Sequence, residues 1–214
     1  MSAFRALRVF EEEGAFVPRL VQRQVDELPA GDVVVQVAYS SLNFKDALSI
    51  SGNRGVTRKY PHTPGIDAAG TVLSSSDARF RAGDPVIVTG YDLGMNTDGG
   101  YGGCIRVPAG WVVPMPAGLD ARRAMALGTA GLTAALCVDS LLQVGIAPAQ
   151  GEVLVTGATG GVGSIAVMLL AQQGFRVVAA TGKADRADWL RQLGAAEVIS
   201  REQLLEGAGK PMLK

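Results

Sequence analysis

The chain has 214 residues, of which 48% are hydrophobic, so it is long and apolar enough for a packed core and wholesale disorder is excluded. Its 20 Lys and Arg balance its 20 Asp and Glu, which gives no electrostatic signature of a nucleic-acid partner or an anionic membrane. Two cysteines and one histidine are too few for a disulfide framework, a cysteine-rich zinc lobe or a His-rich metal site.

The first part of the chain reads as β-rich, because short apolar runs alternate with turn signals. The expected strands cover residues 6–10, 32–39, 70–73, 85–89 and 104–107, and one short helix covers 44–51. This pattern predicts a β-rich domain over residues 1–120.

The pattern changes at Asp120, which is a good N-cap for a helix. That helix is expected to be interrupted by GTAGLTA at residues 128–134 and to resume towards residue 142. Strands are then expected at 152–156, 176–180 and 197–200, alternating with helices at 161–173, 184–193 and 202–206. Strand–helix alternation of this kind indicates parallel βαβ units over residues 121–214.

One uncharged stretch, residues 153–171, approaches the roughly 20 residues that span a bilayer. Glycines at 157, 160, 161 and 163 favour a strand, a turn and a buried helix instead. Residues 1–10 contain two arginines and no long apolar core, so no signal peptide is expected. We therefore expect a cytoplasmic protein without a membrane partner.

The strongest local signal is VLVTGATGGVGS at residues 153–164, placed where a strand passes into a helix. In a dinucleotide site, Gly157 would allow the tight turn, Gly160 the approach of the backbone to phosphate, and Gly163 close helix–strand packing. A Walker A loop does not fit, because no Gly-Lys-Ser/Thr follows. A short-chain dehydrogenase does not fit either, because the last tyrosine, Tyr101, precedes the turn.

The second expected strand is followed by Thr181, Gly182 and Lys183 rather than by the acid typical of an NAD site. Lys183 and Arg186 suit a 2′-phosphate, so the sequence predicts NADPH over NADH. The alternative is a solvated basic face on an exposed helix.

Four further segments carry a family resemblance: YSSLNFKDAL (39–48), PGIDAAGTV (64–72), GTAGLTA (128–134) and TGATGGVGS (156–164). Together they resemble the medium-chain dehydrogenase/reductase superfamily, its zinc-independent quinone oxidoreductase-like branch, and within it the acrylyl-CoA reductase family. The resemblance implies an α/β fold in which a β-rich GroES-like domain is followed by the first half of a Rossmann doubly wound parallel sheet.

The resemblance implies NADPH-dependent reduction of the C=C bond of an α,β-unsaturated thioester, with hydride transfer to the β-carbon; a quinone reductase is the alternative. The implied catalytic residues are Asn43, Lys45, Asp46 and Thr129. The implied cofactor-binding residues are Phe44, Thr159, Gly160, Gly161, Val162, Gly163, Thr181, Gly182, Lys183, Arg186 and Arg201. Ile66 stands where zinc-dependent relatives have a histidine ligand, so no metal is expected.

Bland alternatives apply to several of these residues. Lys45 and Asp46 would form a surface salt bridge, Thr129 would only mark a helix kink, and His62 would be an ordinary loop histidine. Thr97-Asp98 replaces the His-Trp of relatives in a loop that borders their substrate cleft, which leaves the substrate preference open.

Only three parallel strands are expected, whereas a complete dinucleotide domain has about six. We therefore expect a C-terminally truncated chain. It is either a reductase seen in part or a non-catalytic chain that binds nucleotide weakly. By itself, the chain is expected to show little reductase turnover. It is also expected to associate through the free strand edge at residues 153–155. A homodimer is also compatible with the sequence.

Overall fold

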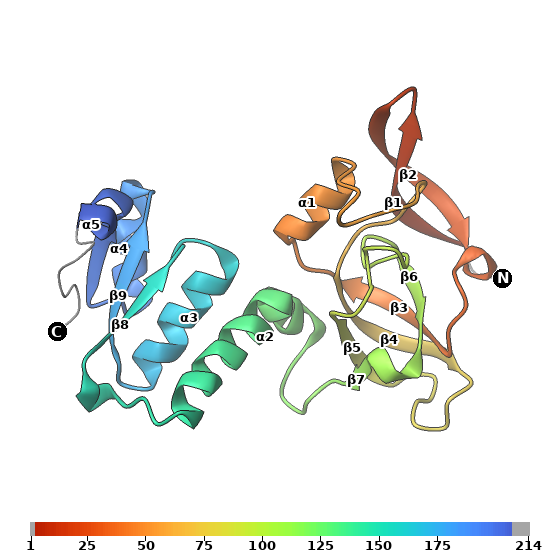
Figure 1. Ribbon diagram of the computed structural model, residues 1–214. Coiled ribbons are helices and arrows are strands. Elements are labelled where there is room, and N and C mark those ends of the chain that lie inside the picture. The colour runs from red at the N-terminus through yellow and green to blue at the C-terminus, as the bar shows by residue number, and fades with distance from the viewer. Residues whose placement is uncertain (1–2, 207–214) are drawn as a thin grey trace. The chain divides into compact units, whose positions relative to one another are not determined.

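The computed structural model describes residues 3–206, and contacts divide the chain into two compact units, Met1–Thr129 and Ala130–Lys214. The division falls inside helix α2 (Ala121–Gln143), whereas the sequence places it after residue 120. Figure 1 shows the elements of both units. Each unit is described by itself.

The first unit contains an antiparallel β-hairpin, a five-stranded antiparallel sheet and one short helix, α1 (Phe44–Ile50). The hairpin strands are β1 (Ala3–Glu12) and β2 (Ala15–Gln24). The sheet has the order β6-β3-β4-β5-β7, formed by β6 (Cys104–Val107), β3 (Val33–Tyr39), β4 (Asp67–Ser75), β5 (Pro85–Thr89) and β7 (Val112–Pro114). Short 3-10 turns lie at Val25–Glu27 and Ala109–Trp111. Alternating apolar residues bury one common core, which includes Val33, Val35, Val86, Val88, Ile105 and Val107.

Two strands of this unit are absent from the sequence-based prediction. β2 is mostly exposed and contains Pro18, and a proline within an apolar run weakens the strand signal. β7 has only three residues. The hairpin is joined to the rest of the unit by bridges between Ala6 and Gly102 and between Val9 and His62.

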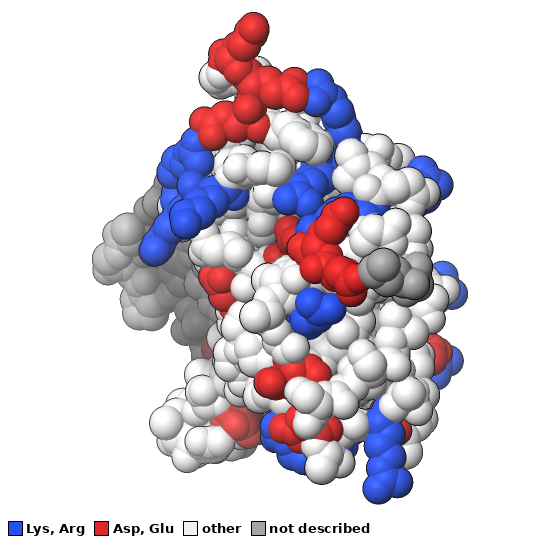
Figure 2. Space-filling view, turned by 90° about the vertical axis from the view of Figure 1, so that its right-hand side faces the viewer, with Lys and Arg blue, Asp and Glu red and all other residues white. Residues whose placement is uncertain are grey.

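The surface of the hairpin carries paired charges. Figure 2 shows acidic side chains gathered at the top, where the hairpin turns, and Lys and Arg interspersed with Asp and Glu below. Glu12 pairs with Arg19 across the hairpin, and Glu11 pairs with Arg54. Two acidic side chains near the hairpin turn are therefore paired with arginines.

The second unit contains a parallel sheet of order β10-β9-β8 among the described residues. Its elements are β8 (Glu152–Thr156), α3 (Gly161–Gln172), β9 (Arg176–Thr181), α4 (Ala187–Gln192), β10 (Glu197–Ser200) and α5 (Arg201–Glu206), with 3-10 turns at Pro148–Gln150 and Ala184–Arg186. Val155, Val167, Leu170, Val177 and Leu190 form its core, together with Ala134 and Val138 of α2. The predicted order, a β-rich unit followed by a parallel sheet of βαβ units, is confirmed.

Helix α2 is long and apolar enough to cross a membrane by length and composition alone. Gly128, however, has φ 50° and ψ −153° and breaks the helix into two segments. Each segment is shorter than the roughly 20 residues that a transmembrane helix needs. The interruption expected over residues 128–134 is therefore confined to Gly128, because residues on both sides of it are helical.

Candidate functional site

A cluster of polar side chains surrounds the fully buried carboxylate of Asp67, the first residue of β4. Asn43 donates from Nδ2 to Asp67 Oδ2 at 2.9 Å. Thr129 donates its backbone N–H to the same oxygen at 3.0 Å and its hydroxyl to Oδ1 at 2.7 Å. Asn43 and Thr129 are both half-buried, so this cluster brings two of the predicted catalytic residues together at the surface of the first unit.

Glycine at position 128 makes the close approach of α2 to Asp67 possible. A Cβ on Gly128 would overlap the Ser41 hydroxyl and would lie 2.7 Å from Asp67 Oδ2. Its backbone conformation is one that side-chain-bearing residues rarely adopt. The GTAGLTA segment therefore has a structural reason for its first glycine, which directs the Thr129 amide at the carboxylate.

Asp46, the third residue of α1, is a second buried carboxylate, with 2% of its surface exposed. Its oxygens accept backbone N–H groups from Asn43 at 2.9 Å, Ile66 at 3.0 Å and Gly65 at 3.2 Å. Tyr101 donates its hydroxyl to the same carboxylate at 3.1 Å, and burial together with this negative charge raises the pKa of Tyr101. Asp46 therefore joins three segments of the first unit.

The surface salt bridge offered as the alternative for Lys45 and Asp46 does not form. Lys45 is exposed, whereas the Asp46 carboxylate points inward, and neither residue belongs to an ion pair in the described part of the chain. The reason is that neighbouring helix positions face different directions. A direct catalytic role for either residue stays a prediction.

Ile66 is the residue that the resemblance places at the zinc-ligand position of zinc-dependent relatives. Its side chain is buried and its backbone N–H is bound by Asp46. Across residues 3–206, no group of three or more His, Cys, Asp or Glu side chains is arranged to hold a metal ion.

The glycine turn of the second unit connects β8 to α3. Gly157 has φ 59°, and its carbonyl accepts the N–H of Gly160 at 2.9 Å. A Cβ on Gly163 would overlap the Gly157 carbonyl, so glycine is required there for close packing of α3 against the turn. Gly160, Gly161, Val162 and Gly163 line a groove of about 470 Å³ that continues along β8. The helix N-terminus at this groove attracts anions through its N–H groups and dipole.

A smaller polar pocket of about 180 Å³ lies beside the turn and is lined by Thr159, Lys183, Arg186 and Trp189. The Thr159 and Thr181 hydroxyl oxygens lie 3.2 Å apart, and Thr181 Oγ1 accepts the Lys183 N–H at 3.1 Å. The structure thus brings together three predicted cofactor residues that come from two different loops. Trp189 was not predicted, because its position depends on how the turn at Ala184–Arg186 leads into α4.

Arg201 and Gly182 meet at the far side of the same loop. A Cβ on Gly182 would lie 3.1 Å from Arg201 Nε, so the guanidinium lies against the Gly182 backbone. A hollow of about 260 Å³ between the ends of β9 and β10 is lined by Thr181, Gly182, Ala184, Ala187, Val198, Ile199, Ser200, Glu202 and Gln203. Phe44 is the one predicted cofactor residue in the first unit, where its side chain is 80% exposed.

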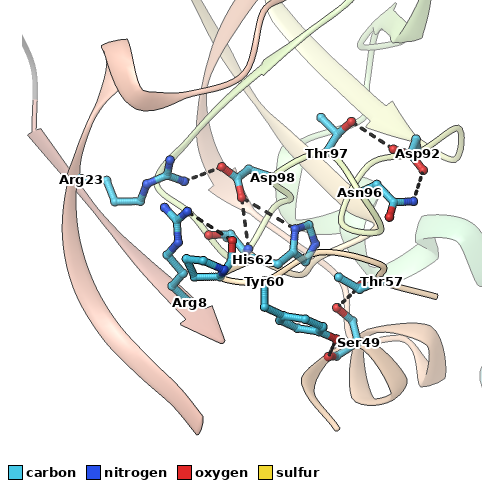
Figure 3. A network of polar contacts seen from close by, with 12 residues as sticks. Arg8, Arg23, Ser49, Thr57, Tyr60, His62, Asp92, Asn96, Thr97 and Asp98 are labelled. Carbon is cyan, nitrogen blue, oxygen red and sulfur yellow. Dashed lines mark hydrogen bonds and ion pairs between the residues drawn. The ribbon is translucent and has the colours of Figure 1, made fainter. Parts of the chain in front are cut away.

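Thr97 and Asp98 are half-buried, and both make hydrogen bonds within the first unit (Figure 3). Arg23 donates from Nη1 to Asp98 Oδ2 at 2.6 Å, and Asp98 Oδ1 accepts the Thr63 N–H at 3.1 Å. Thr97 donates to Asp92 at 3.2 Å. Asp98 therefore belongs to an internal charge network, a role that the sequence did not predict.

His62 belongs to this network and is not an ordinary loop histidine. Only 3% of it is exposed, and its Nδ1 lies 3.8 Å from Asp98 Oδ1. Burial lowers the pKa of His62, against a smaller opposing effect of Asp98. The antiparallel bridge between Val9 and His62 holds this residue against the hairpin, which explains its burial.

Comparison with known proteins supports the predicted resemblance. Residues 29–117 match the family described as alcohol dehydrogenase GroES-like domain. The chain is 48% identical to acrylyl-CoA reductase AcuI of Ruegeria pomeroyi over 94% of this chain and 61% of that protein. It is 52% identical to putative quinone oxidoreductase YhfP of Bacillus subtilis over 88% of this chain and 57% of that protein.

Solved structures agree in fold. The yhdH oxidoreductase of Salmonella enterica, in complex with NADP, superposes with a TM-score of 0.91 at 47% identity, covering 93% of this chain and 61% of that chain. YhfP of Bacillus subtilis with NAD bound superposes with a TM-score of 0.93 at 48% identity, covering 97% of this chain and 63% of that chain. The chain therefore spans about three fifths of the length of these relatives, and its resemblance to the medium-chain dehydrogenase/reductase superfamily is confirmed.

Proposed function

We propose that this chain, which resembles the medium-chain dehydrogenases/reductases and carries an alcohol dehydrogenase GroES-like domain, provides the substrate-binding and cofactor-binding elements of an NADPH-dependent oxidoreductase. The reaction proposed is reduction of the C=C bond of an α,β-unsaturated thioester such as acrylyl-CoA, without a metal. The observation that carries the proposal is the pocket of Thr159, Lys183, Arg186 and Trp189 beside the glycine turn.

The residues of the second unit fit a phosphorylated dinucleotide. The start of α3 and the glycine turn suit the pyrophosphate, whose negative charge is favoured at a helix N-terminus. Lys183 and Arg186 supply two cations in one small pocket, which suits the extra phosphate that distinguishes NADPH from NADH. Two of the solved relatives contain NADP or NADPH and one contains NAD, so the relatives and the pocket both favour NADPH.

The first unit supplies the polar group that the reaction needs. NADPH, when bound, supplies the hydride that is added to the β-carbon. Negative charge then builds on the thioester carbonyl oxygen, and Asn43 donates an amide N–H to it. Asp67 holds that amide in place before substrate binds, so little reorganisation is needed during reaction. A proton added at the α-carbon completes the reduction.

A quinone is the second candidate substrate, and a relative named putative quinone oxidoreductase favours it. The same amide N–H suits a quinone carbonyl, so the cluster around Asp67 does not separate the two. Steady-state NADPH oxidation with acrylyl-CoA and with a benzoquinone separates them, and we expect the larger kcat/KM with acrylyl-CoA.

Replacement of Lys183 tests the cofactor part of the proposal. A hydrogen bond to a charged group contributes about 1.5–3 kcal/mol, so Lys183→Ala should weaken NADPH binding by about tenfold or more while NADH binding stays the same. Lys59→Ala, which removes an exposed lysine in the first unit, is the control and should change neither affinity. Titration calorimetry measures both. Equal affinity of the unmodified protein for NADH and NADPH would contradict the preference.

A further inference from the structure

The geometry around Asp67 points to a role that the sequence did not predict. We infer that Asp67 is a positioning residue that fixes the direction of the hydrogen bonds offered by Asn43 and Thr129. This inference deepens the proposed function and rests on it, because the reaction requires a donor at Asn43. Asp67 itself is fully buried and touches the reaction only through these two residues.

The direction of the Asn43 side chain follows from a backbone contact. Thr129 N–H can only donate, so Asp67 Oδ2 is an acceptor at 3.0 Å. The same oxygen lies 2.9 Å from the Asn43 amide, which must therefore turn its NH₂ group and not its carbonyl towards Asp67. One N–H of Asn43 is used in this contact, and the second N–H is directed away from Asp67. A carbonyl oxygen of the substrate thus meets a donor with a fixed orientation.

The direction of the Thr129 hydroxyl follows in the same way. A hydroxyl has one proton, and at 2.7 Å from Asp67 Oδ1 that proton is given to the carboxylate. Towards any other atom, Thr129 Oγ1 can therefore only accept. The two residues consequently have opposite functions: Asn43 recognises a carbonyl oxygen, and Thr129 recognises an N–H or O–H group of a ligand. Thr129 is not the source of the proton at the α-carbon.

The Asp67 carboxylate belongs to no ion pair within residues 3–206, and it accepts the hydrogen bonds of Asn43 and Thr129 described above. Replacing one carboxylate oxygen by NH₂ in Asp67→Asn places a donor against a donor. Either Asn43 or Thr129 must then turn.

Nuclear magnetic resonance tests the orientation without any reaction. In the unmodified protein, the two side-chain amide protons of Asn43 should have different shifts, one of them exchanging slowly, and the Thr129 hydroxyl proton should be observable. Asp67→Asn should move the Asn43 amide signals. Asp98→Asn, which changes a half-buried carboxylate of the same unit, should leave them in place. Asn43 amide signals and a Thr129 hydroxyl signal that both stay unmoved in Asp67→Asn, or rapid exchange of the Thr129 hydroxyl in the unmodified protein, would overturn the inference.

Kinetics test whether the orientation matters for reduction. Asp67→Asn should lower kcat about 10- to 100-fold, as expected for loss of an oriented group, and should change KM for NADPH less than about twofold. In an Asn43→Ala background, Asp67→Asn should lower kcat by less than a further twofold or so, because its effect passes through Asn43. Losses that multiply in full would overturn a positioning role. If neither acrylyl-CoA nor a quinone supports NADPH oxidation by the unmodified protein, the proposed function is wrong. The amide and hydroxyl signals still decide whether Asp67 orients Asn43 and Thr129.

Discussion

The surroundings of Asp46 and Asp67 differ although the two residues are of the same type, equally buried and part of the same unit. Asp46 accepts three backbone N–H groups and one side-chain hydroxyl, that of Tyr101, and these donors belong to the segments that it joins. Asp67 accepts two side-chain donors and one backbone donor, and both side chains are half-buried. A buried carboxylate that binds backbone thus holds the fold, whereas one that binds surface side chains controls what they offer to a ligand.

Replacing each carboxylate by alanine tests this difference most directly. We expect the larger loss in the free energy of unfolding at Asp46. Asp46→Ala leaves several buried N–H groups without an acceptor, at about 1–3 kcal/mol each, and should lower the free energy of unfolding by about 3 kcal/mol or more. Asp67→Ala should cost less, because Asn43 and Thr129 can turn their side chains to water. Urea unfolding of the two variants measures the difference, and equal losses would show that the distinction is wrong.

Gly128 provides a second test of the Asp67 cluster, because its backbone lies against the Asp67 carboxylate. Gly128→Ala introduces a Cβ against Ser41 and Asp67 and places alanine in a conformation that nearly only glycine adopts. We expect a loss of about 2–4 kcal/mol in the free energy of unfolding, together with lower activity. Gly118→Ala is the matched control, since Gly118 also has a positive φ, 83°, but open space around it. A loss in Gly118→Ala as large as that in Gly128→Ala would mean that backbone conformation alone explains the effect.

His62 is a buried base, in contrast to the two buried acids Asp46 and Asp67. We expect its effect on the free energy of unfolding to be the smallest of the three. Its charge would be affected by Asp98, Asp92 and Arg8, while Arg23 already pairs with Asp98. Because burial lowers the pKa of His62 in the folded protein, the unfolded chain takes up a proton first as the pH falls. At pH values above the histidine pKa of the unfolded chain, near 6.5, His62 therefore does not lower the free energy of unfolding. Below that pH, it lowers the free energy of unfolding progressively.

The measurement is the free energy of unfolding of the unmodified protein and of His62→Gln between about pH 7 and pH 5. The unmodified protein should lose more stability on acidification than the variant, which lacks the titrating ring. Parallel curves for the two proteins would mean that His62 does not titrate differently on folding.

Much of the fold could be predicted, because the apolar runs in the sequence are the same segments that form buried strands in the structure. β5, β6 and β8 have the predicted bounds, since each is a short apolar run between turn residues. β2 could not be predicted, because its side chains are exposed and only the ladder with β1 holds it. The helix interruption was predicted at the correct place but over too many residues, 128–134 instead of Gly128 alone. Sequence alone does not show which glycine packs against another segment.

The candidate site was predictable as a set of residues but not as a geometry. Asn43 and Thr129 were identified through motifs, yet their common partner Asp67 was not, because the contact joins segments far apart in the chain. Asp98 was assigned to a substrate-facing loop, although its partner Arg23 comes from the hairpin. Such contacts depend on long-range pairing, which local periodicity does not encode.

Trp189 gives the second unit a signal of its own. The chain has two tryptophans, and the other, Trp111, lies in the first unit with its ring stacked 5.2 Å from Tyr91. Trp189 alone lines the pocket with Lys183 and Arg186. Any anion that enters that pocket changes the polarity next to the indole, so occupancy should change the contribution of Trp189 to the tryptophan emission. The contribution of Trp111, which stacks on Tyr91 within the first unit, should stay constant.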